Sequence, residues 1–564
     1  MGTSLPDAPA TIPEALARAA RDYAGRGIGI FDNRGREVER KTYRELLDLA
    51  NRNAARFATL GVGAREPVLV SLPTSWSWME SWFGVLLCGG WPVAMAAPGG
   101  MAAAEAQLHK VDQVMDRLGA RRIVATDAFR EQARAAGYPW AEDGVLTPEG
   151  LSAIAPQAGF RPRSAEPGAI AFLQLTSGST GLPRAVMIPH SAAVHNPLAS
   201  SEAIGAPHGA PAHAWADCMV AWLPMYHDMG LIGCLMLPML TGLDVWLLRP
   251  TTFLARPRLW LEHLGGHGVS FAPAPNFAYQ LCVERVSAGE LEGVDLSGWR
   301  AALTGAETVR PETTSAFCDA FTRIGFAREA FMPCYGLAEG PLAVTFDMKR
   351  EGVRTLPAPA GADSGLGLAD VVCTGAPIRD TRVRISAPDG SDRADGRIGE
   401  VWVHGPGVFA GYFNDPEATA DALRDGWLAT GDLGFLHDGE LYLTGRVKEV
   451  LIVRGQNLMP DELERLADSV TGGGGLTRSA AFSVARGVEG EEAVMVVEVA
   501  DGQPEGLADL EQEIRVRVGR GLSLPLADVV FVRRGRIPRT TSGKMQRNEL
   551  RRRYLDGELE RIDR

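Results

Sequence analysis

The chain of 564 residues is too long for one ordinary domain, and its hydrophobic content of 46% is enough for a substantial core. Its formal net charge of −12 excludes nucleic acid as an expected partner and gives no reason to expect an anionic membrane surface. The seven cysteines are scattered without CxxC spacing, so we expect free thiols in a reducing compartment rather than a zinc site.

Two further features bear on location. The N-terminal stretch MGTSLPDAP lacks the basic and apolar regions of a secretion signal. The longest apolar run, residues 231–248, is interrupted by Pro238, Gly242 and Asp244, so it is more typical of buried core than of a membrane span. We expect a cytoplasmic protein with no transmembrane segment.

Helix and strand patterns alternate over the first part of the chain. Thr42 and Glu45 form a capping-box pattern that predicts the start of a helix. Further on, the pattern predicts strands at 68–71, 92–95 and 122–126, separated by helices at 76–87 and around 108–118. Such alternation predicts a mostly parallel sheet covered by helices.

A loop rich in glycine and hydroxyl groups follows the apolar run at residues 169–175, which predicts a buried strand. Gly178 and Gly181 permit positive φ, and the free N–H and hydroxyl groups around them can converge on an anion. The loop therefore suits the phosphates of a nucleotide, although a cluster of this kind taken alone is more often an ordinary polar turn.

Three later segments contain candidate site residues. His227 lies in an apolar context next to Asp228, where it could face a pocket or be a core histidine with satisfied hydrogen bonds. The prolines of residues 272–277 predict a loop that lines a site, because proline resists both helix and central strand. Glu307 and Glu339 each follow a short strand-like run and could simply stabilise a helix start, but beside phosphates Glu339 is better suited to bind Mg²⁺.

The pattern changes twice in the second half. From about residue 375, short alternating strands and turns predict a β-rich subdomain that ends near residue 446. A compact α+β pattern follows, with a helix from Pro460, strands at 480–484 and 493–499, and a helix through 510–518. We therefore predict an N-terminal domain of residues 1–446 and a C-terminal domain of residues 447–564.

The end of the chain is basic. Lys544 lies on a Thr-Ser-Gly turn among the arginines of residues 533–553, where Glu549 is the one acidic residue. In an otherwise acidic protein, this end could receive an anion, an acidic carrier protein or the phosphates of CoA, or it could be a solvated basic helix end.

Together these stretches resemble the adenylate-forming superfamily of acyl-CoA synthetases, peptide-synthetase adenylation domains and luciferases, over essentially the whole chain. The closer resemblance is to the fatty acyl-AMP ligase branch. It rests on WLPMYHDMGLIG (222–233), APAPNFAYQLC (272–282), FMPCYGLAEGPLAVT (331–345), LATGDLGFLHDGELYLTGR (428–446) and IPRTTSGK (537–544). The resemblance implies an α/β fold, in which a large domain of stacked, mostly parallel sheets with a β-rich subdomain precedes a small mobile α+β domain hinged at Lys448.

The resemblance also implies ATP and Mg²⁺ as cofactors and assigns residues to them. Glu339 binds Mg²⁺, and Asp432 accepts hydrogen bonds from the ribose hydroxyls. The catalytic candidates are Lys544, which bridges the α-phosphate and the carboxylate, Arg446 and His227. The remaining ATP-binding candidates are Thr176, Ser177, Gly178, Ser179 and Thr180 for the phosphates, and Gly305, Ala306, Glu307, Tyr335 and Gly336 for the adenine. The acyl-binding candidates are Met225, Asp228, Met229, Leu231, Ile232 and Phe277.

The implied activity is ATP-dependent conversion of a fatty or similarly apolar acid to acyl-AMP, followed by transfer to the phosphopantetheine thiol of an acyl carrier protein. An acyl-CoA synthetase that uses free CoA is the main alternative, because residues 347–372 form a short stretch where the branch carries a hinge-restraining insertion. A catalytically silent scaffold or sensor is disfavoured, since Lys544, Glu339, Asp432 and Arg446 are all present. A P-loop NTPase is excluded by the lack of GxxxxGK[ST].

Overall fold

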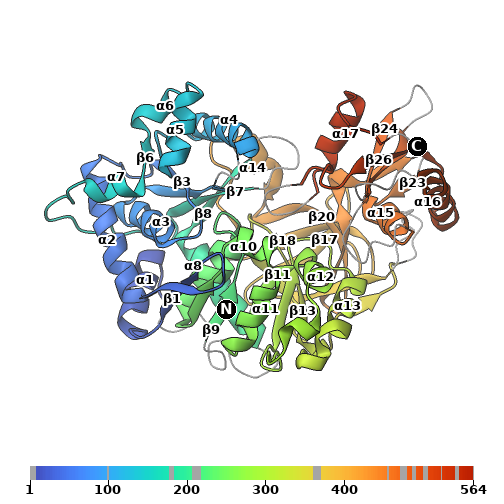
Figure 1. Cartoon of the computed structure of the whole chain (residues 1–564), viewed down its shortest axis with the longest axis horizontal. Coiled ribbons are helices and arrows are strands. Elements are labelled where there is room, and N and C mark those ends of the chain that lie inside the picture. The colour runs from blue at the N-terminus through green and yellow to red at the C-terminus, as the bar shows by residue number, and fades with distance from the viewer. Residues whose placement is uncertain are drawn as a thin grey trace.

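The computed structural model describes residues 8–97, 101–176, 183–205, 218–359, 370–453, 456–470, 479–485, 491–499, 506–522, 524–539 and 545–562. The described elements form four sheets with helices packed around them (Figure 1). The alternation of strands and helices expected from the sequence is therefore confirmed.

The first half of the chain supplies a six-stranded sheet, in the order β6-β5-β3-β4-β7-β8, which is parallel except for β8. The elements of this half are α1 (Ile12–Asp22), β1 (Gly27–Phe31), β2 (Glu37–Thr42), α2 (Tyr43–Thr59), β3 (Pro67–Ser71), α3 (Trp76–Cys88), β4 (Trp91–Ala94), α4 (Met101–Leu118), β5 (Arg122–Ala125), α5 (Asp127–Ala135), α6 (Trp140–Asp143), β6 (Val145–Leu146), α7 (Pro148–Ala153), β7 (Ile170–Leu175), β8 (Ala185–Pro189) and α8 (His190–Gly205).

The middle of the chain completes a four-stranded sheet, in the order β2-β1-β10-β9, and begins a larger one at β11. Its elements are β9 (Cys218–Ala221), the π-helix η3 (Met229–Met236), α9 (Leu237–Thr241), β10 (Asp244–Leu247), α10 (Pro250–Ala255), α11 (Arg258–Gly266), β11 (Phe271–Pro275), α12 (Asn276–Arg285), η4 (Ala288–Leu291), β12 (Ala301–Gly305), α13 (Pro311–Phe321), η5 (Thr322–Ile324), η6 (Arg328–Ala330), β13 (Phe331–Gly336), β14 (Ala343–Phe346), β15 (Thr355–Leu356) and β16 (Val371–Pro377).

The larger sheet has eleven strands, with the path β11-β12-β13-β14-β16-β21-β20-β18-β17. Its first three strands are parallel and the remainder is antiparallel. The antiparallel strands run from β14 to β21, residues 343–446, and so begin before residue 375, where the sequence predicts short alternating strands. Its later elements are β17 (Arg382–Ser386), β18 (Gly399–His404), α14 (Pro416–Ala422), β19 (Leu423–Arg424), β20 (Trp427–His437), β21 (Glu440–Arg446) and η7 (Val447–Glu449).

The last elements form a separate five-stranded sheet with the order β23-β22-β25-β24, in which β26 also pairs with β25. They lie together at the upper right of Figure 1, apart from the first helices at the left. The elements are β22 (Leu451–Val453), β23 (Gln456–Leu458), α15 (Pro460–Asp468), β24 (Ser479–Ala485), β25 (Glu491–Val499), α16 (Leu507–Leu522), β26 (Leu526–Arg533) and α17 (Arg547–Leu555).

The loop predicted at residues 272–277 is wrong, because the structure has strand β11 there, followed by α12. β11 is the edge strand of the large sheet and pairs with β12 alone. Pro273 and Pro275 alternate with Ala272 and Ala274, so the missing N–H groups lie on one side of the strand while the other side can still donate.

The apolar run at 231–248 is divided among η3, α9 and β10, as its interruptions predicted. Its residues from Leu231 to Leu240 are almost entirely buried. Among the described residues, no helix is long and apolar enough to cross a membrane.

Ion pairs join the last sheet to the rest of the protein. Arg310, in the loop after β12, lies 3.2 Å from Asp468 of α15, and the Thr308 hydroxyl donates to Asp461 of the same helix at 2.9 Å. Arg534, which follows β26, lies 3.9 Å from Glu284 of α12. The last sheet is thus held against the end of β12 by charged groups.

The capping box at the start of α2 is confirmed and gives a stability prediction. The Thr42 hydroxyl accepts from the N–H of Glu45 at 3.2 Å, and the Glu45 carboxylate accepts from the N–H of Thr42 at 2.8 Å. Thr42→Ala should lower the free energy of unfolding by about 1 kcal/mol, measured by denaturant titration, because it leaves a helix-end N–H unpaired. The exposed neighbour Arg44→Ala is the control, and equal losses in both variants would contradict the assignment.

Candidate active site

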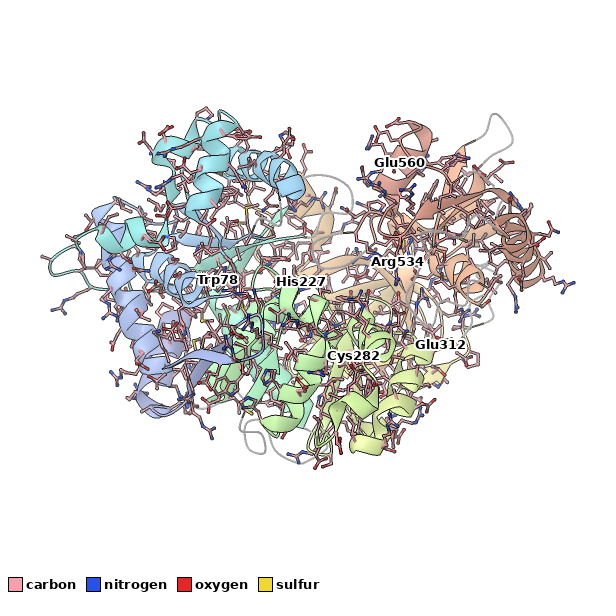
Figure 2. The ribbon with its side chains drawn as sticks, viewed as in Figure 1. Trp78, His227, Cys282, Glu312, Arg534 and Glu560 are labelled. Carbon is pink, nitrogen blue, oxygen red and sulfur yellow. The ribbon has the colours of Figure 1, made fainter. Side chains whose placement is uncertain are left out.

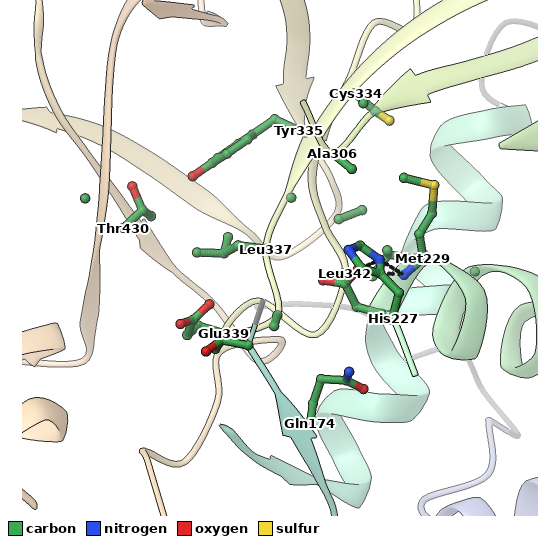
Figure 3. Close-up of a pocket in the computed structure, with 18 of the residues that line it drawn as sticks. Gln174, His227, Met229, Ala306, Cys334, Tyr335, Leu337, Glu339, Leu342 and Thr430 are labelled. Carbon is green, nitrogen blue, oxygen red and sulfur yellow. Dashed lines mark hydrogen bonds and ion pairs between the residues drawn. The ribbon is translucent and has the colours of Figure 1, made fainter. Parts of the chain in front are cut away.

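A cavity of about 630 Å³ lies between the six-stranded sheet, the large sheet and the last elements of the chain (Figure 3). Its volume is in the range of small-molecule sites. One end is lined by polar groups such as Thr176, Arg184, Glu339 and Arg446. The other end is apolar, with Ile204, Met219, Leu237, Phe271, Leu303 and Phe346.

Many residues singled out in the sequence line this cavity, and His227 lies near the centre of the molecule (Figure 2). They are Thr176, His227, Asp228, Met229, Gly305, Ala306, Tyr335, Gly336, Glu339, Arg446 and Lys448. Six others are described but are not among the lining residues, namely Met225, Leu231, Ile232, Phe277, Glu307 and Asp432. Ser177, Gly178, Ser179, Thr180 and Lys544 lie outside the described residues.

The carboxyl ends of β12 and β13 form one wall. Gly305 ends β12, and a Cβ atom there would lie 2.5 Å from the backbone oxygen of Cys334, so only glycine permits this approach. Ala306 follows with φ of +66°, an unfavourable left-handed conformation for alanine. The Glu307 carboxylate turns away and accepts from the N–H of Phe277 at 2.6 Å, where it stabilises the start of α12.

A hydrogen-bonded group of three side chains lies behind this wall. Asp432 accepts from the Tyr335 hydroxyl at 2.6 Å and from Nε of Arg446 at 2.8 Å. Burial raises the pKa of Tyr335 well above its usual value, and the charge of Asp432 adds to that effect. The same carboxylate raises the pKa of Arg446. A carboxylate has about four acceptor sites, so Asp432 retains the capacity to accept from a ligand.

Glu339 occupies the polar end of the cavity. Its Oε1 atom accepts from the Tyr412 hydroxyl at 2.7 Å. Burial raises the pKa of Glu339, while the hydrogen bond from Tyr412 lowers it and so favours the charged carboxylate. The Arg184 guanidinium lies 5.1 Å from the centre of the Tyr412 ring and places a positive charge nearby.

The carboxylate of Glu339 is suited to a metal ion that is also bound by a ligand. The described residues contain no group of three or more His, Cys, Asp or Glu side chains that could hold a metal by themselves. Mg²⁺ is commonly bound by one or two carboxylates together with phosphate oxygens and water. Glu339, a carboxylate at the polar end, fits that arrangement.

His227 is hydrogen-bonded and also faces the cavity. Its Nδ1 atom lies 2.6 Å from Oδ1 of Asp228, and the same carboxylate oxygen accepts from the N–H of Met229 at 2.7 Å. Gln174 donates to the backbone oxygen of Tyr226 at 2.8 Å and fixes the preceding turn. His227 is therefore both a histidine with hydrogen-bond partners and a residue that lines the pocket.

The acyl-binding candidates on η3 differ in whether they line the cavity. Met229, Gly233 and Leu237 line the cavity at a spacing of four residues, while Leu231 and Ile232 are buried elsewhere. Helical spacing from Met229 was the signal that would have identified Gly233 and Leu237. Tyr412 and Asn548, which also contribute to the cavity region, follow no pattern of this kind.

The interpretation of the C-terminal arginines as opposed by Glu549 alone is wrong. Arg552 also pairs with Asp556 and Glu558, each at 2.8 Å. Arg534 lies 3.9 Å from Glu284, and Arg536 lies 2.8 Å from Glu560. Acids outside residues 533–553 therefore offset much of this charge.

Comparison with known proteins gives matches over most of the chain. A family model described as AMP-binding enzyme matches residues 16–413. JamA, a medium-chain-fatty-acid–[acyl-carrier-protein] ligase of Moorena producens, is 34% identical over 69% of each chain. The long-chain-fatty-acid–AMP ligase FadD26 of Mycobacterium tuberculosis is 34% identical over 70% of this chain and 71% of its own. A structure from a study of fatty acyl-adenylate ligases from E. coli and L. pneumophila has a TM-score of 0.86 and 30% identity, over 97% of this chain and 98% of that chain.

The contact between Tyr412 and Glu339 gives a prediction about metal binding. Tyr412→Phe keeps the ring and removes the donor, so the pKa of Glu339 should rise further and its charged form should be lost at a higher pH as the pH falls. We expect Mg²⁺-dependent ATP binding, measured by calorimetry over a range of pH, to weaken roughly 10- to 100-fold, most strongly in acid.

Tyr43→Phe is the matched control, because the Tyr43 hydroxyl makes a buried hydrogen bond to the backbone oxygen of Leu243 far along the chain from Glu339. Unchanged Mg²⁺ dependence in Tyr412→Phe would show that Glu339 does not hold the ion.

Proposed function

The chain belongs to the AMP-binding enzyme family of adenylate-forming ligases, near its fatty acyl-AMP ligase branch, and from this premise we propose its substrate, its acceptor and the roles of its residues. The acid is a fatty or similarly apolar carboxylic acid, and the final acceptor is the phosphopantetheine thiol of an acyl carrier protein. The observation that carries the proposal is a single cavity with a polar end at Glu339 and an apolar end at Phe271.

In the first step, a carboxylate oxygen attacks the α-phosphorus of ATP and the bond to the pyrophosphate oxygen breaks. Both reactants are anions, so the protein must neutralise charge and hold them in line. Thr176 and the loop that follows it hold the phosphates, and Lys544 bridges the α-phosphate and the carboxylate. Glu339 would hold Mg²⁺, which would supply further neutralisation of the phosphate charge.

The nucleoside lies against the wall formed by Gly305, Ala306 and Tyr335. Asp432 positions Tyr335 and Arg446 through its two hydrogen bonds and accepts from the ribose hydroxyls. The acid extends the other way, past His227 and Met229 toward the apolar end. Each buried methylene contributes about 0.8 kcal/mol, which favours an alkyl chain over a short polar acid.

In the second step, a thiolate sulfur attacks the acyl carbonyl, the carbon–oxygen bond to the phosphate breaks, and AMP leaves. We propose that the elements after Lys448 form a mobile domain that rotates between the two steps. Asn548 and Lys448 line the cavity while Arg310 holds α15, so the described arrangement brings this domain to the polar end. Rotation would expose both partners of these few ion pairs to water, so neither would be left as an unpaired buried charge.

Two observations support a carrier protein as acceptor. JamA, whose name specifies an acyl carrier protein, is among the similar proteins. Within the short stretch noted above, Pro359 lines a second cavity, of about 490 Å³, together with Val447 and Val450, which flank the hinge. A contact there would restrain the hinge, as the insertion of the branch does. Free CoA is the alternative acceptor.

All seven cysteines are free thiols, which agrees with a reducing cytoplasm.

Lys544→Ala tests the adenylation step. Pyrophosphate release with ATP and a fatty acid should fall roughly 10²- to 10³-fold, because one of the few positive charges between two anions is lost. Arg536→Ala, which removes another positive charge from the same part of the chain, should leave the rate nearly unchanged. Full activity in Lys544→Ala would refute its role.

The acceptor is tested by forming the adenylate and offering CoA and a phosphopantetheinylated carrier protein in separate reactions. We expect acyl transfer to the carrier, detected by mass spectrometry, and little acyl-CoA. A carrier whose thiol arm is absent serves as the control. Acyl-CoA in quantity would favour the alternative acceptor, and pyrophosphate release with neither acceptor labelled would contradict both.

A further inference from the structure

Ser200 places a hydroxyl group on the apolar part of the cavity wall. It lies on α8, one turn before Ile204, and lines the cavity among residues such as Leu237, Phe271 and Phe346. A serine at this position is unexpected if the only ligand were an unsubstituted alkyl chain, since alanine would fill the same space without a polar atom.

The hydroxyl of Ser200 has no hydrogen-bond partner among the residues that the structure describes, although the side chain is only 1% exposed. Three other polar side chains that line the cavity do have partners. Gln174 donates to Tyr226, Cys334 to Thr304 and Thr430 to Val401, each through a backbone oxygen. Buried hydroxyls are normally paired, so a partner for Ser200 is expected from a ligand.

The contacts that α8 makes on either side of Ser200 locate this residue along the cavity. One turn earlier, Asn196 donates to the backbone oxygens of Gly340 and Ala343 at 2.9 and 2.8 Å, next to Glu339. One turn later, the backbone oxygen of Ile204 accepts from Arg350 at 2.7 Å, and Arg350 also donates to the backbone oxygen of Arg300, just before β12. Ser200 therefore lies about 6 Å along α8 from Asn196, on the Glu339 side, and about 6 Å from Ile204, on the other side.

From these contacts we infer that the acid carries a hydroxyl group in the middle of its chain, and that Ser200 selects it by a hydrogen bond. The inference deepens the proposed function and rests on it. A hydroxyl next to the carboxylate would lie too near Glu339, and one at the chain terminus would lie beyond Ser200. Ser200 acts on specificity and takes no part in the bond-making step.

The test compares pyrophosphate release with fatty acids of one length that carry no hydroxyl, a hydroxyl beside the carboxyl end, a mid-chain hydroxyl or a terminal hydroxyl. The wild type should prefer a mid-chain hydroxy acid over the unsubstituted acid, by kcat/KM, about tenfold. Ser200→Ala should abolish that preference and keep or improve activity with the unsubstituted acid.

Ser201→Ala is the matched control, because Ser201 is the next residue on α8, is equally buried at 1% exposure, and is not among the cavity-lining residues. It should retain the preference. A preference that persists in Ser200→Ala, or a wild type that favours no hydroxy acid, would overturn the inference while leaving fatty-acid activation intact. No pyrophosphate release with any of the acids would instead refute the proposed function, and the inference with it.

Discussion

Bringing a carboxylate into contact with a triphosphate is the constraint on which the arrangement of this site depends. Two anions repel, so positive groups must converge where they meet, and water must be kept from screening them. The polar end of the cavity meets this need with few groups. Arg184 covers Tyr412, the Tyr412 hydroxyl donates to Glu339 and so favours its charged form, and Asp432 holds Arg446. The apolar end needs none of these charges, so one cavity can serve an acid with a charged head and an apolar tail.

The same constraint explains the distribution of the site over the chain. A positive charge that brings the carboxylate and the triphosphate together would also hinder the departure of AMP if its position were fixed. This favours placing some of the positive groups on separate elements that can move. The last sheet meets the remainder of the protein through Arg310, Thr308 and Arg534, which are polar contacts that can be exchanged for contacts with water. The aromatic side chains behind β11 to β13, including Trp260 and Trp299 with ring centres 5.3 Å apart, instead give the nucleoside wall a rigid support.

Much of this could be predicted from the sequence, because it depends on local patterns. The capping box of Thr42, the strand before Thr176 and the glycine at 305 follow from spacing and backbone freedom. The misassigned features depend on distant partners. The strand at β11 tolerates proline because it is an edge, and the arginines near Lys544 are offset by acids such as Glu284. The roles of Tyr412 and Ser200 depend only on their positions in the cavity, so no pattern in the chain could identify them.

The central claim is that the nucleotide and the acyl chain occupy the two ends of one cavity and meet between Glu339 and His227. A crystal structure with a non-hydrolysable acyl-adenylate analogue tests it most directly. The account predicts the ribose beside Tyr335 and Asp432, the phosphate mimic beside Glu339, and the alkyl chain along Met229, Leu237 and Phe271. An alkyl chain directed into solvent or into the cavity beside Pro359 would contradict it.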